Sequence, residues 1–205
     1  MILFFGSSTT AGENSEVKFT DFLETKEVIK NLGIPGTTLG EYSIYPVDGN
    51  SLLSLIKKHE GLIKTCDKIV LEYGINDVTA IMCGFTTTRS VMVTFVKALD
   101  AIRQLNPTVD IKFLTISCDS ETIYEYSVKM CKYLSDIYFK GYDIEIYSPR
   151  WGRVYWDLFE EVFKKNLDCR EMFKHKNEYL ENLSSDNLHV NEVGHKIIAK
   201  NIGIL

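Results

Sequence analysis

The sequence lacks several features that mark common functional classes. Its 205 residues contain 23 Lys and Arg against 28 Asp and Glu, so the formal net charge is -5 rather than positive. Binding to nucleic acid needs clustered cations that neutralise phosphates, so this charge balance argues against a nucleic-acid partner. No stretch approaches the roughly 18 apolar residues that a membrane-spanning helix needs, and we therefore expect no membrane span.

Signatures of disulfide scaffolds and metal sites are also missing. The five cysteines are odd in number and none lies in a C-x-x-C pair, so we expect reduced thiols that are mostly buried as small apolar side chains. There is no H-E-x-x-H motif, and the four histidines do not stand at metal-ligand spacing. The sequence predicts no metal and no other cofactor.

The amino-terminal apolar run is too short for a secretory signal. It stops at Phe5 and no basic residues precede it. Together with the expectation of reduced cysteines, this favours a cytoplasmic location.

What the sequence does contain is a regular alternation of short apolar runs and amphipathic segments. The apolar runs predict five strands, at residues 2–5, 27–32, 68–73, 111–116 and 142–147. The amphipathic segments predict helices at 49–64, with Asn50 or Ser51 as the cap, at 88–105 and at 121–139. This alternation favours a parallel sheet covered by helices on both faces.

Length and composition fit one domain over residues 1–205. The hydrophobic content of 45% is enough for a single well-buried core. Residues 150–185 resemble a helical insertion that is rich in aromatic and charged residues. The insertion could form a lid or pocket wall, or it could only add helical packing.

Polar loops follow three of the predicted strands. They read "GSSTTAG" at 6–12, "GIPGTT" at 33–38 and "GIND" at 74–77, and a fourth polar segment, "SDNLHVNEVGHKIIA", occupies 185–199. Ligands of open α/β sheets bind beyond the carboxyl ends of the strands, so these loops are where a site is expected. Each loop taken alone could equally serve as a cap or a turn.

Taken together and in order, these segments resemble the four sequence blocks of the SGNH hydrolases, also called the GDSL family. Residues 6–9 resemble the G-D-S-L block, residues 74–77 match G-x-N-D, residues 186–189 match D-x-x-H, and Gly36 matches the glycine of the second block. The resemblance implies a flavodoxin-like three-layer α/β/α sandwich with a mostly five-stranded parallel sheet. It also implies an ester hydrolase that uses a serine nucleophile.

The resemblance implies a role for each matching residue. Ser8 would be the nucleophile, His189 the base that accepts its proton, and Asp186 the carboxylate that orients the imidazole. The backbone N–H groups of Ser8 and Gly36 and the side-chain amide of Asn76 would form the oxyanion hole. No metal is needed for this chemistry.

The sequence departs from the family pattern beside the nucleophile. Ser7 stands where the family has an aspartate, which in the family accepts hydrogen bonds and helps shape the nucleophile turn, and Thr9 replaces the usual leucine. Ser7 is also an alternative nucleophile. We expect structural roles for Asp77 and His195.

The substrate is less defined by the sequence. Pocket walls are expected in the loop after the third strand at 78–85, in the loop after the fourth strand at 117–126, and at 148–156, which holds Arg150, Trp151, Arg153, Tyr155 and Trp156. Aromatic rings stack on sugars and arginines bind anionic groups, so we expect a small-molecule or carbohydrate ester with a short acyl or O-acetyl group. The alternatives are a non-catalytic carbohydrate- or nucleotide-binding module and an acyltransferase with the same triad. The sequence leaves the oligomeric state open.

Overall fold

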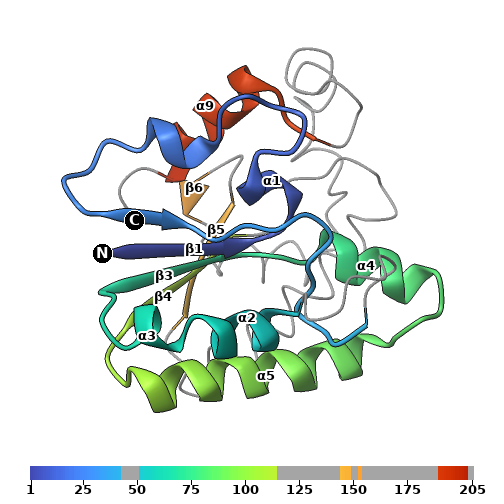
Figure 1. Cartoon of the computed structure of the whole chain (residues 1–205). Coiled ribbons are helices and arrows are strands. Elements are labelled where there is room, and N and C mark those ends of the chain that lie inside the picture. Colours follow the sequence, from blue (N-terminus) through green and yellow to red (C-terminus); the bar gives the residue numbers. More distant parts are fainter. Residues whose placement is uncertain (43–50, 115–143, 149–151, 154–188, 203–205) are drawn as a thin grey trace, which may run out of the picture.

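The fold is built around a single sheet. The computed structural model describes residues 1–42, 51–114, 144–148, 152–153 and 189–202. The strands are β1 (Ile2–Gly6), β2 (Ile29–Asn31), β3 (Lys68–Glu72), β4 (Asp110–Leu114), β5 (Ile144–Ser148) and β6 (Gly152–Arg153). They lie in the order β2-β1-β3-β4-β5-β6 (Figure 1). All neighbouring pairs are parallel except β5 and the two-residue β6, which are antiparallel.

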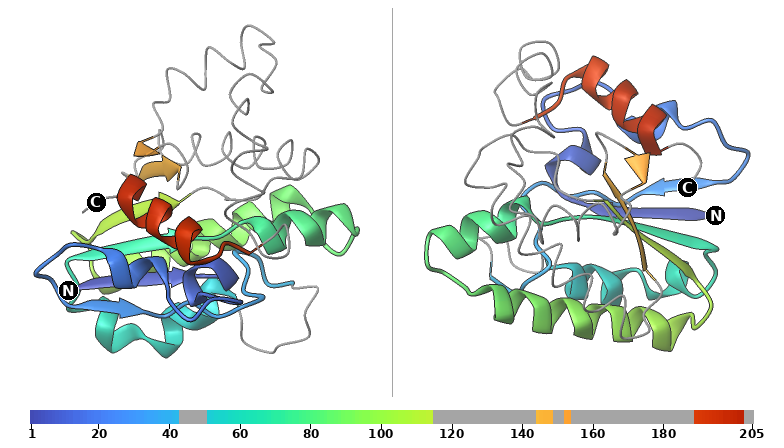
Figure 2. Two further views of the ribbon diagram at one scale, coloured as in Figure 1. Left: turned by 90° about the horizontal axis from the view of Figure 1, so that it is seen from above. Right: turned by 180° about the vertical axis from the view of Figure 1, so that it is seen from behind.

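Helices cover both faces of this sheet. They are α1 (Ser8–Ala11), the 3-10 helix η1 (Phe19–Phe22), α2 (Leu52–Lys58), α3 (Glu60–Ile63), α4 (Ile75–Met82), α5 (Thr88–Leu105) and α9 (Glu192–Ile202). The two views of Figure 2 place α2, α3 and α5 on one face and α1, η1 and α9 on the other. The predicted α/β fold with a parallel sheet between two helical layers is therefore confirmed.

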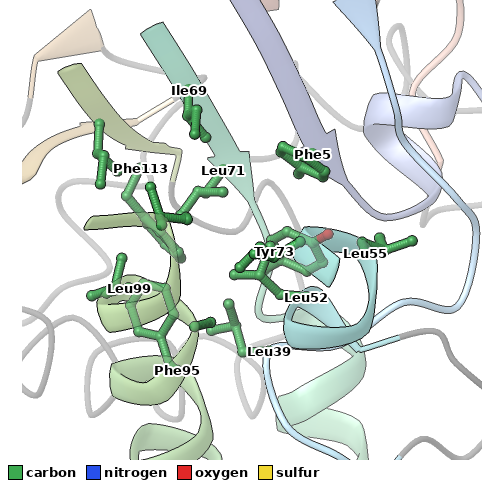
Figure 3. Close-up of a cluster of buried hydrophobic side chains, with 14 of the residues drawn as sticks. Phe5, Leu39, Leu52, Leu55, Ile69, Leu71, Tyr73, Phe95, Leu99 and Phe113 are labelled. Atoms are coloured by element: carbon green, nitrogen blue, oxygen red, sulfur yellow. The ribbon is translucent and has the colours of Figure 1, made fainter. Parts of the chain in front are cut away.

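The core consists of two hydrophobic clusters separated by the sheet. Successive strand side chains point to opposite faces, so Leu3 and Phe5 join the cluster under α2 and α5, whereas Ile2 and Phe4 join the cluster under α9. Figure 3 shows the first cluster, where strand residues such as Phe113 meet side chains of α5. Each fully buried Leu, Ile or Phe side chain contributes about 1.5–3 kcal/mol to the free energy of folding.

The predicted strands and helices can be compared with the structure wherever its residues are described. The five predicted strands are present as β1 to β5, although β2 is shorter than predicted and residues 115–116 lie outside the described part. The helix predicted at 88–105 is α5. The predicted helix 121–139 and almost all of the insertion at 150–185 also lie outside the described residues.

Two predictions about local structure were wrong. The single helix expected at 49–64 is interrupted at His59, which ends α2 and precedes α3. Residues 78–85 were expected to be a loop, yet residues 75–82 form α4. Val78 is fully buried and Ile81 packs against the core, so an apolar face with helical spacing outweighs the turn-forming Asn76 and Asp77.

Ser51 and Cys66 lie as the sequence predicted, whereas Cys83 does not. Ser51 is the N-cap of α2, and its hydroxyl accepts a hydrogen bond from the Ser54 N–H at 3.3 Å. Cys66 is buried, as expected, but Cys83 is exposed because it follows the end of α4. Across the described ranges, the structure contains no helix with the length and apolar character of a transmembrane segment.

Candidate active site

The candidate nucleophile lies on a tight turn between β1 and α1. β1 ends at Gly6, Ser7 occupies the N-cap position, and Ser8 is the first residue of α1. Ser7 is fully buried, whereas the exposed fraction of Ser8 is 8%. Ser8 therefore stands at the carboxyl edge of the sheet, where the sequence predicted it.

Glu72, which the sequence analysis did not single out, lies directly beneath this turn. It is the last residue of β3 and pairs in register with Gly6 of the neighbouring β1. Its Oε2 atom accepts hydrogen bonds from the Thr10 hydroxyl at 3.0 Å and from the Ser7 hydroxyl at 3.3 Å. The Ser7 N–H also points to this oxygen, at 3.4 Å. The carboxylate thus contacts residues on both sides of Ser8.

Burial dominates the protonation of Glu72. Its exposed fraction is 2%, and desolvation raises the pKa of the carboxyl from 4.5 to about 7. Hydrogen bonds from Thr10 and Ser7 act in the opposite direction and offset only part of the rise. A single acidic residue near the end of an apolar strand was the available sequence signal for this group.

A chain of buried hydrogen bonds connects the first three sequence blocks. The Thr37 hydroxyl donates to the Gly6 carbonyl at 3.0 Å, and the Asn76 amide donates to the Thr37 carbonyl at 2.9 Å. Gly36, next to Thr37, has a φ of 76°, a conformation that favours glycine. The loops after β1, β2 and β3 are therefore held together at one edge of the sheet.

The Asp77 carboxylate holds the loop that follows Gly36 in the second block. It is fully buried and accepts the N–H groups of Leu39 at 2.9 Å and Gly40 at 2.8 Å. Desolvation raises the pKa of Asp77 to about 6, and the bonds from Leu39 and Gly40 lower it in part. This is a structural role, as expected: Asp77 holds the loop that follows Gly36.

His189, which belongs to the fourth block, lies beside Glu13 and Asn14, the residues that follow α1. The Nε2 atom of His189 lies 3.4 Å from a carboxylate oxygen of Glu13, and its Nδ1 atom lies 3.2 Å from the amide nitrogen of Asn14. The Glu13 N–H bonds the Ser8 carbonyl at 2.9 Å, so the imidazole lies beside the segment that leaves α1. Among the hydrogen bonds between described residues, none joins the Ser8 hydroxyl directly to His189. Asp186 lies outside the described residues.

The other histidine of this region, His195, belongs to the core. It is fully buried in α9 and stacks on Phe19, with ring centroids 6.3 Å apart. Desolvation lowers the pKa of His195 to about 4, so the ring is neutral near pH 7. This placement agrees with the expected structural role.

No metal site is apparent in the part of the chain that can be described. Within residues 1–42, 51–114 and the other described ranges, no three His, Cys, Asp or Glu side chains are grouped so that they could hold a metal ion. Of the expected pocket walls, 117–126 and most of 148–156 lie outside these ranges, including Arg150, Trp151, Tyr155 and Trp156.

Comparison with known proteins places this geometry in context. Residues 2–202 match the family described as GDSL-like Lipase/Acylhydrolase. A search of curated proteins finds no match.

Solved structures with the same fold include three that align over almost the whole chain. A lipase from a goat rumen metagenome is 13% identical, with a TM-score of 0.65 over 98% of this chain and 94% of the other. A member of the lipolytic G-D-S-L family from Veillonella parvula is 17% identical, with a TM-score of 0.60 over 98% and 94% of the two chains. A variant of Axe2, an acetyl xylan esterase from Geobacillus stearothermophilus, is 16% identical, with a TM-score of 0.60 over 98% and 91%.

Proposed function

The chain belongs to the GDSL-like lipase/acylhydrolase family and is a carboxylic ester hydrolase, and we propose that it cleaves its substrate through an acyl-enzyme formed on Ser8. In this proposal the Ser8 hydroxyl attacks the acyl carbon while His189 takes its proton. Asp186 orients the imidazole and stabilises its charged form.

The proposed reaction has two matching halves. Collapse of the first tetrahedral intermediate breaks the ester bond, and the leaving alcohol takes the proton held by His189. A water molecule then attacks the acyl-enzyme, gives a proton to His189, and releases the acid while that proton returns to the Ser8 oxygen.

The observation that carries the proposal is the buried hydrogen-bond chain from Gly6 through Thr37 to Asn76. It holds the first three loops at one edge of the sheet, which supports an oxyanion hole formed by the N–H groups of Ser8 and Gly36 and the amide of Asn76. Three such donors would stabilise the negative charge that forms on the acyl oxygen in the transition state. Loss of one donor of this kind typically lowers kcat by a factor of about 10²–10³.

The burial of the two adjacent serines supports Ser8 as the nucleophile rather than Ser7. Ser7 has no exposed surface, and its hydroxyl donates to Glu72. An acyl group cannot approach a hydroxyl that is enclosed in this way without displacing the turn.

For the substrate we propose a short acyl ester, with an O-acetyl group on a carbohydrate as the leading candidate. This choice is supported by two solved structures with this fold, Axe2 and AlAXEase, which carry the name acetyl xylan esterase. Acetate also needs little apolar surface around the acyl carbon, whereas a long acyl chain needs an extended apolar groove.

Kinetics of p-nitrophenyl acetate hydrolysis test the nucleophile. We expect Ser8→Ala to lower kcat by about 10⁴-fold or more, because loss of a serine nucleophile removes the acyl-enzyme route. Ser7→Ala is the comparison variant: it removes one hydrogen bond to Glu72 but leaves the Ser8 hydroxyl, so it should lose no more than about tenfold in kcat. Loss of activity in Ser7→Ala with retention in Ser8→Ala would reverse the assignment.

A panel of esters and acceptors tests the substrate class. The protein should release acetate from acetylated xylo-oligosaccharides faster than it releases decanoate from a p-nitrophenyl ester. Formation of a new ester when an alcohol acceptor is added would identify an acyltransferase instead. Sugar binding with no turnover of any ester would identify a binding module.

A further inference from the structure

A buried carboxylate without a cationic partner lies under the nucleophile turn. Glu72 forms no ion pair among the described residues, and its exposed fraction is 2%. Burying a charged group without a counter-charge is costly unless several hydrogen bonds compensate for the lost water. A buried carboxyl group of this kind beside a proposed site is therefore a candidate for a functional role.

The hydrogen bonds to Glu72 are placed to fix the turn on both sides of Ser8. Ser7, the residue before Ser8, donates to Glu72 Oε2 through both its N–H and its hydroxyl. Thr10, two residues after Ser8, donates to the same atom through its hydroxyl. All three donors converge on Oε2, an atom that can accept hydrogen bonds from each of them. Glu72 itself is held by the parallel pairing of β3 with β1.

We propose that Glu72 is the positioning residue of the nucleophile turn, and that its carboxylate keeps the Ser8 hydroxyl and N–H oriented toward the acyl group during the reaction. This inference rests on the proposed function of Ser8. Position 7 carries a serine in this chain, so the carboxylate is supplied by the neighbouring strand instead of by the turn itself. Ser7 transmits the effect because it bonds Glu72 through both its backbone and its side chain.

The expected consequence is a loss of rate with little change in substrate binding. Glu72 does not face the substrate in this proposal, and a nucleophile displaced by about 1 Å can lose about 10²-fold in rate. Glu72→Gln keeps the shape and one acceptor oxygen but removes the charge, and hydrogen bonds to charged groups are about twice as strong as neutral ones. A merely structural carboxylate would change the stability but not kcat.

The test compares four variants in p-nitrophenyl acetate hydrolysis and in the rate of fluorophosphonate labelling. We expect Glu72→Gln to lower kcat and the labelling rate about tenfold at unchanged KM, the loss expected when a charge-assisted hydrogen bond becomes neutral. Adding Ser7→Asp to Glu72→Gln should restore most of the rate, because the carboxylate then comes from the turn. Ser7→Asp alone should be slower than the wild type, because two carboxylates then face each other. Ile69→Val, a buried change on the same strand, should leave kcat unchanged.

Two further variants keep the test decisive if Glu72→Gln does not fold. Thr10→Val removes one donor to Glu72 while keeping the side-chain shape, whereas Thr10→Ser keeps the hydroxyl. We expect only Thr10→Val to lower kcat. Equal activities of these two variants, or wild-type kcat in Glu72→Gln, would overturn the inference.

The outcomes also separate this inference from the proposed function. Wild-type kcat in Glu72→Gln together with an inactive Ser8→Ala variant would reject the role of Glu72 and leave Ser8 as the nucleophile. Full activity of Ser8→Ala would reject the proposed function, whatever Glu72→Gln does.

Discussion

At the scale of single residues, the nucleophile turn depends on a glycine that leaves room for its neighbours. A Cβ atom on Gly6 would lie 2.0 Å from the Thr10 hydroxyl oxygen and 2.9 Å from the Glu72 carbonyl. The space above Gly6 is therefore already filled by the side chain that bonds the Glu72 carboxylate. The turn and the carboxylate form one packed unit.

Gly6→Ala is expected to disturb that unit. Thr10 must move and its bond to Glu72 must lengthen, so we expect the free energy of unfolding to fall by about 1–3 kcal/mol, the usual cost of overpacking. Urea denaturation measures this change. Gly61→Ala is the matched control, because nothing lies within 4 Å of a Cβ at Gly61 and Ala favours a helix over Gly by about 1 kcal/mol. A stable Gly6→Ala variant with normal fluorophosphonate labelling would contradict the packing described here.

The site residues differ in how far the sequence could identify them. Ser8, Asn76 and His189 fall in polar blocks at the ends of apolar segments, and such blocks stand out in a single sequence. Glu72 belongs to the run "KIVLEY", where one acidic residue is also compatible with an exposed strand end. Only the parallel pairing of β3 with β1 shows that this carboxylate lies under the turn.

At the scale of secondary-structure elements, the helix boundaries follow local chemistry where caps are strong. α5 begins after Thr87, whose hydroxyl accepts the Ser90 N–H at 3.2 Å, and it ends before Asn106 and Pro107. These signals made α5 predictable from the sequence. α4 has no such cap, because Gly74 precedes it, and its helical state depends on burial of Val78 in the core.

Asn106 connects the end of α5 to the end of α3 and to the segment before β3. Its side-chain amide donates to the carbonyls of Ile63 and Cys66, each at 2.9 Å, and so ties the end of α5 to the segment between α3 and β3. Asn106→Asp removes both donors and places a carboxylate against two carbonyl oxygens. We expect it to lower the free energy of unfolding by about 1–3 kcal/mol. Thr108→Ala, an exposed change on the same turn, should have little effect, and equal stability of the two variants would contradict this role.

At the scale of the whole molecule, burial of titratable groups makes stability depend on pH, and among the described residues Glu72, Asp77 and His195 act between about pH 4 and pH 7. The pKa values of Glu72 and Asp77 rise to about 7 and about 6, so the folded protein holds protons that the unfolded chain releases. Stability due to these groups is therefore lost as pH rises, from 4.5 to 7 for Glu72 and from 3.8 to 6 for Asp77. His195 acts oppositely: its pKa falls from 6.5 to about 4, so its contribution is lost as pH falls through that range.

Between pH 4.5 and pH 6 the two carboxyls favour a decline of stability with rising pH, and His195, joined by His59 with its lowered pKa, opposes it; because the shifts of the two carboxyls are large, we expect a net decline. The net slope is at most about 1.4 kcal/mol per pH unit, the value for one proton. Urea midpoints measured across this range should show the decline in the wild type, a flatter curve for Glu72→Gln and a steeper one for His195→Phe. A decline that Glu72→Gln leaves unchanged would contradict the raised pKa of the buried Glu72 carboxyl.

The sequence predicted the overall architecture more reliably than the local irregularities. Apolar runs such as "ILFF" and "KIVLEY" lie in buried parallel strands, whose composition is distinctive. The break at His59 coincides with a contact between its ring and that of Phe5 in β1, which the sequence pattern does not reveal. The two-residue β6 is too short to give a periodic sequence signal. The same limit applies to the loop 37–40, whose conformation depends on the buried carboxylate of Asp77.

The most direct test of the central claim is to map the serine that reacts with a fluorophosphonate. After labelling and proteolysis, mass spectrometry of the peptide spanning residues 2–18 should place one covalent adduct on Ser8, and Ser8→Ala should give none. An adduct on Ser7, or an adduct that persists elsewhere in the Ser8→Ala variant, would contradict the account.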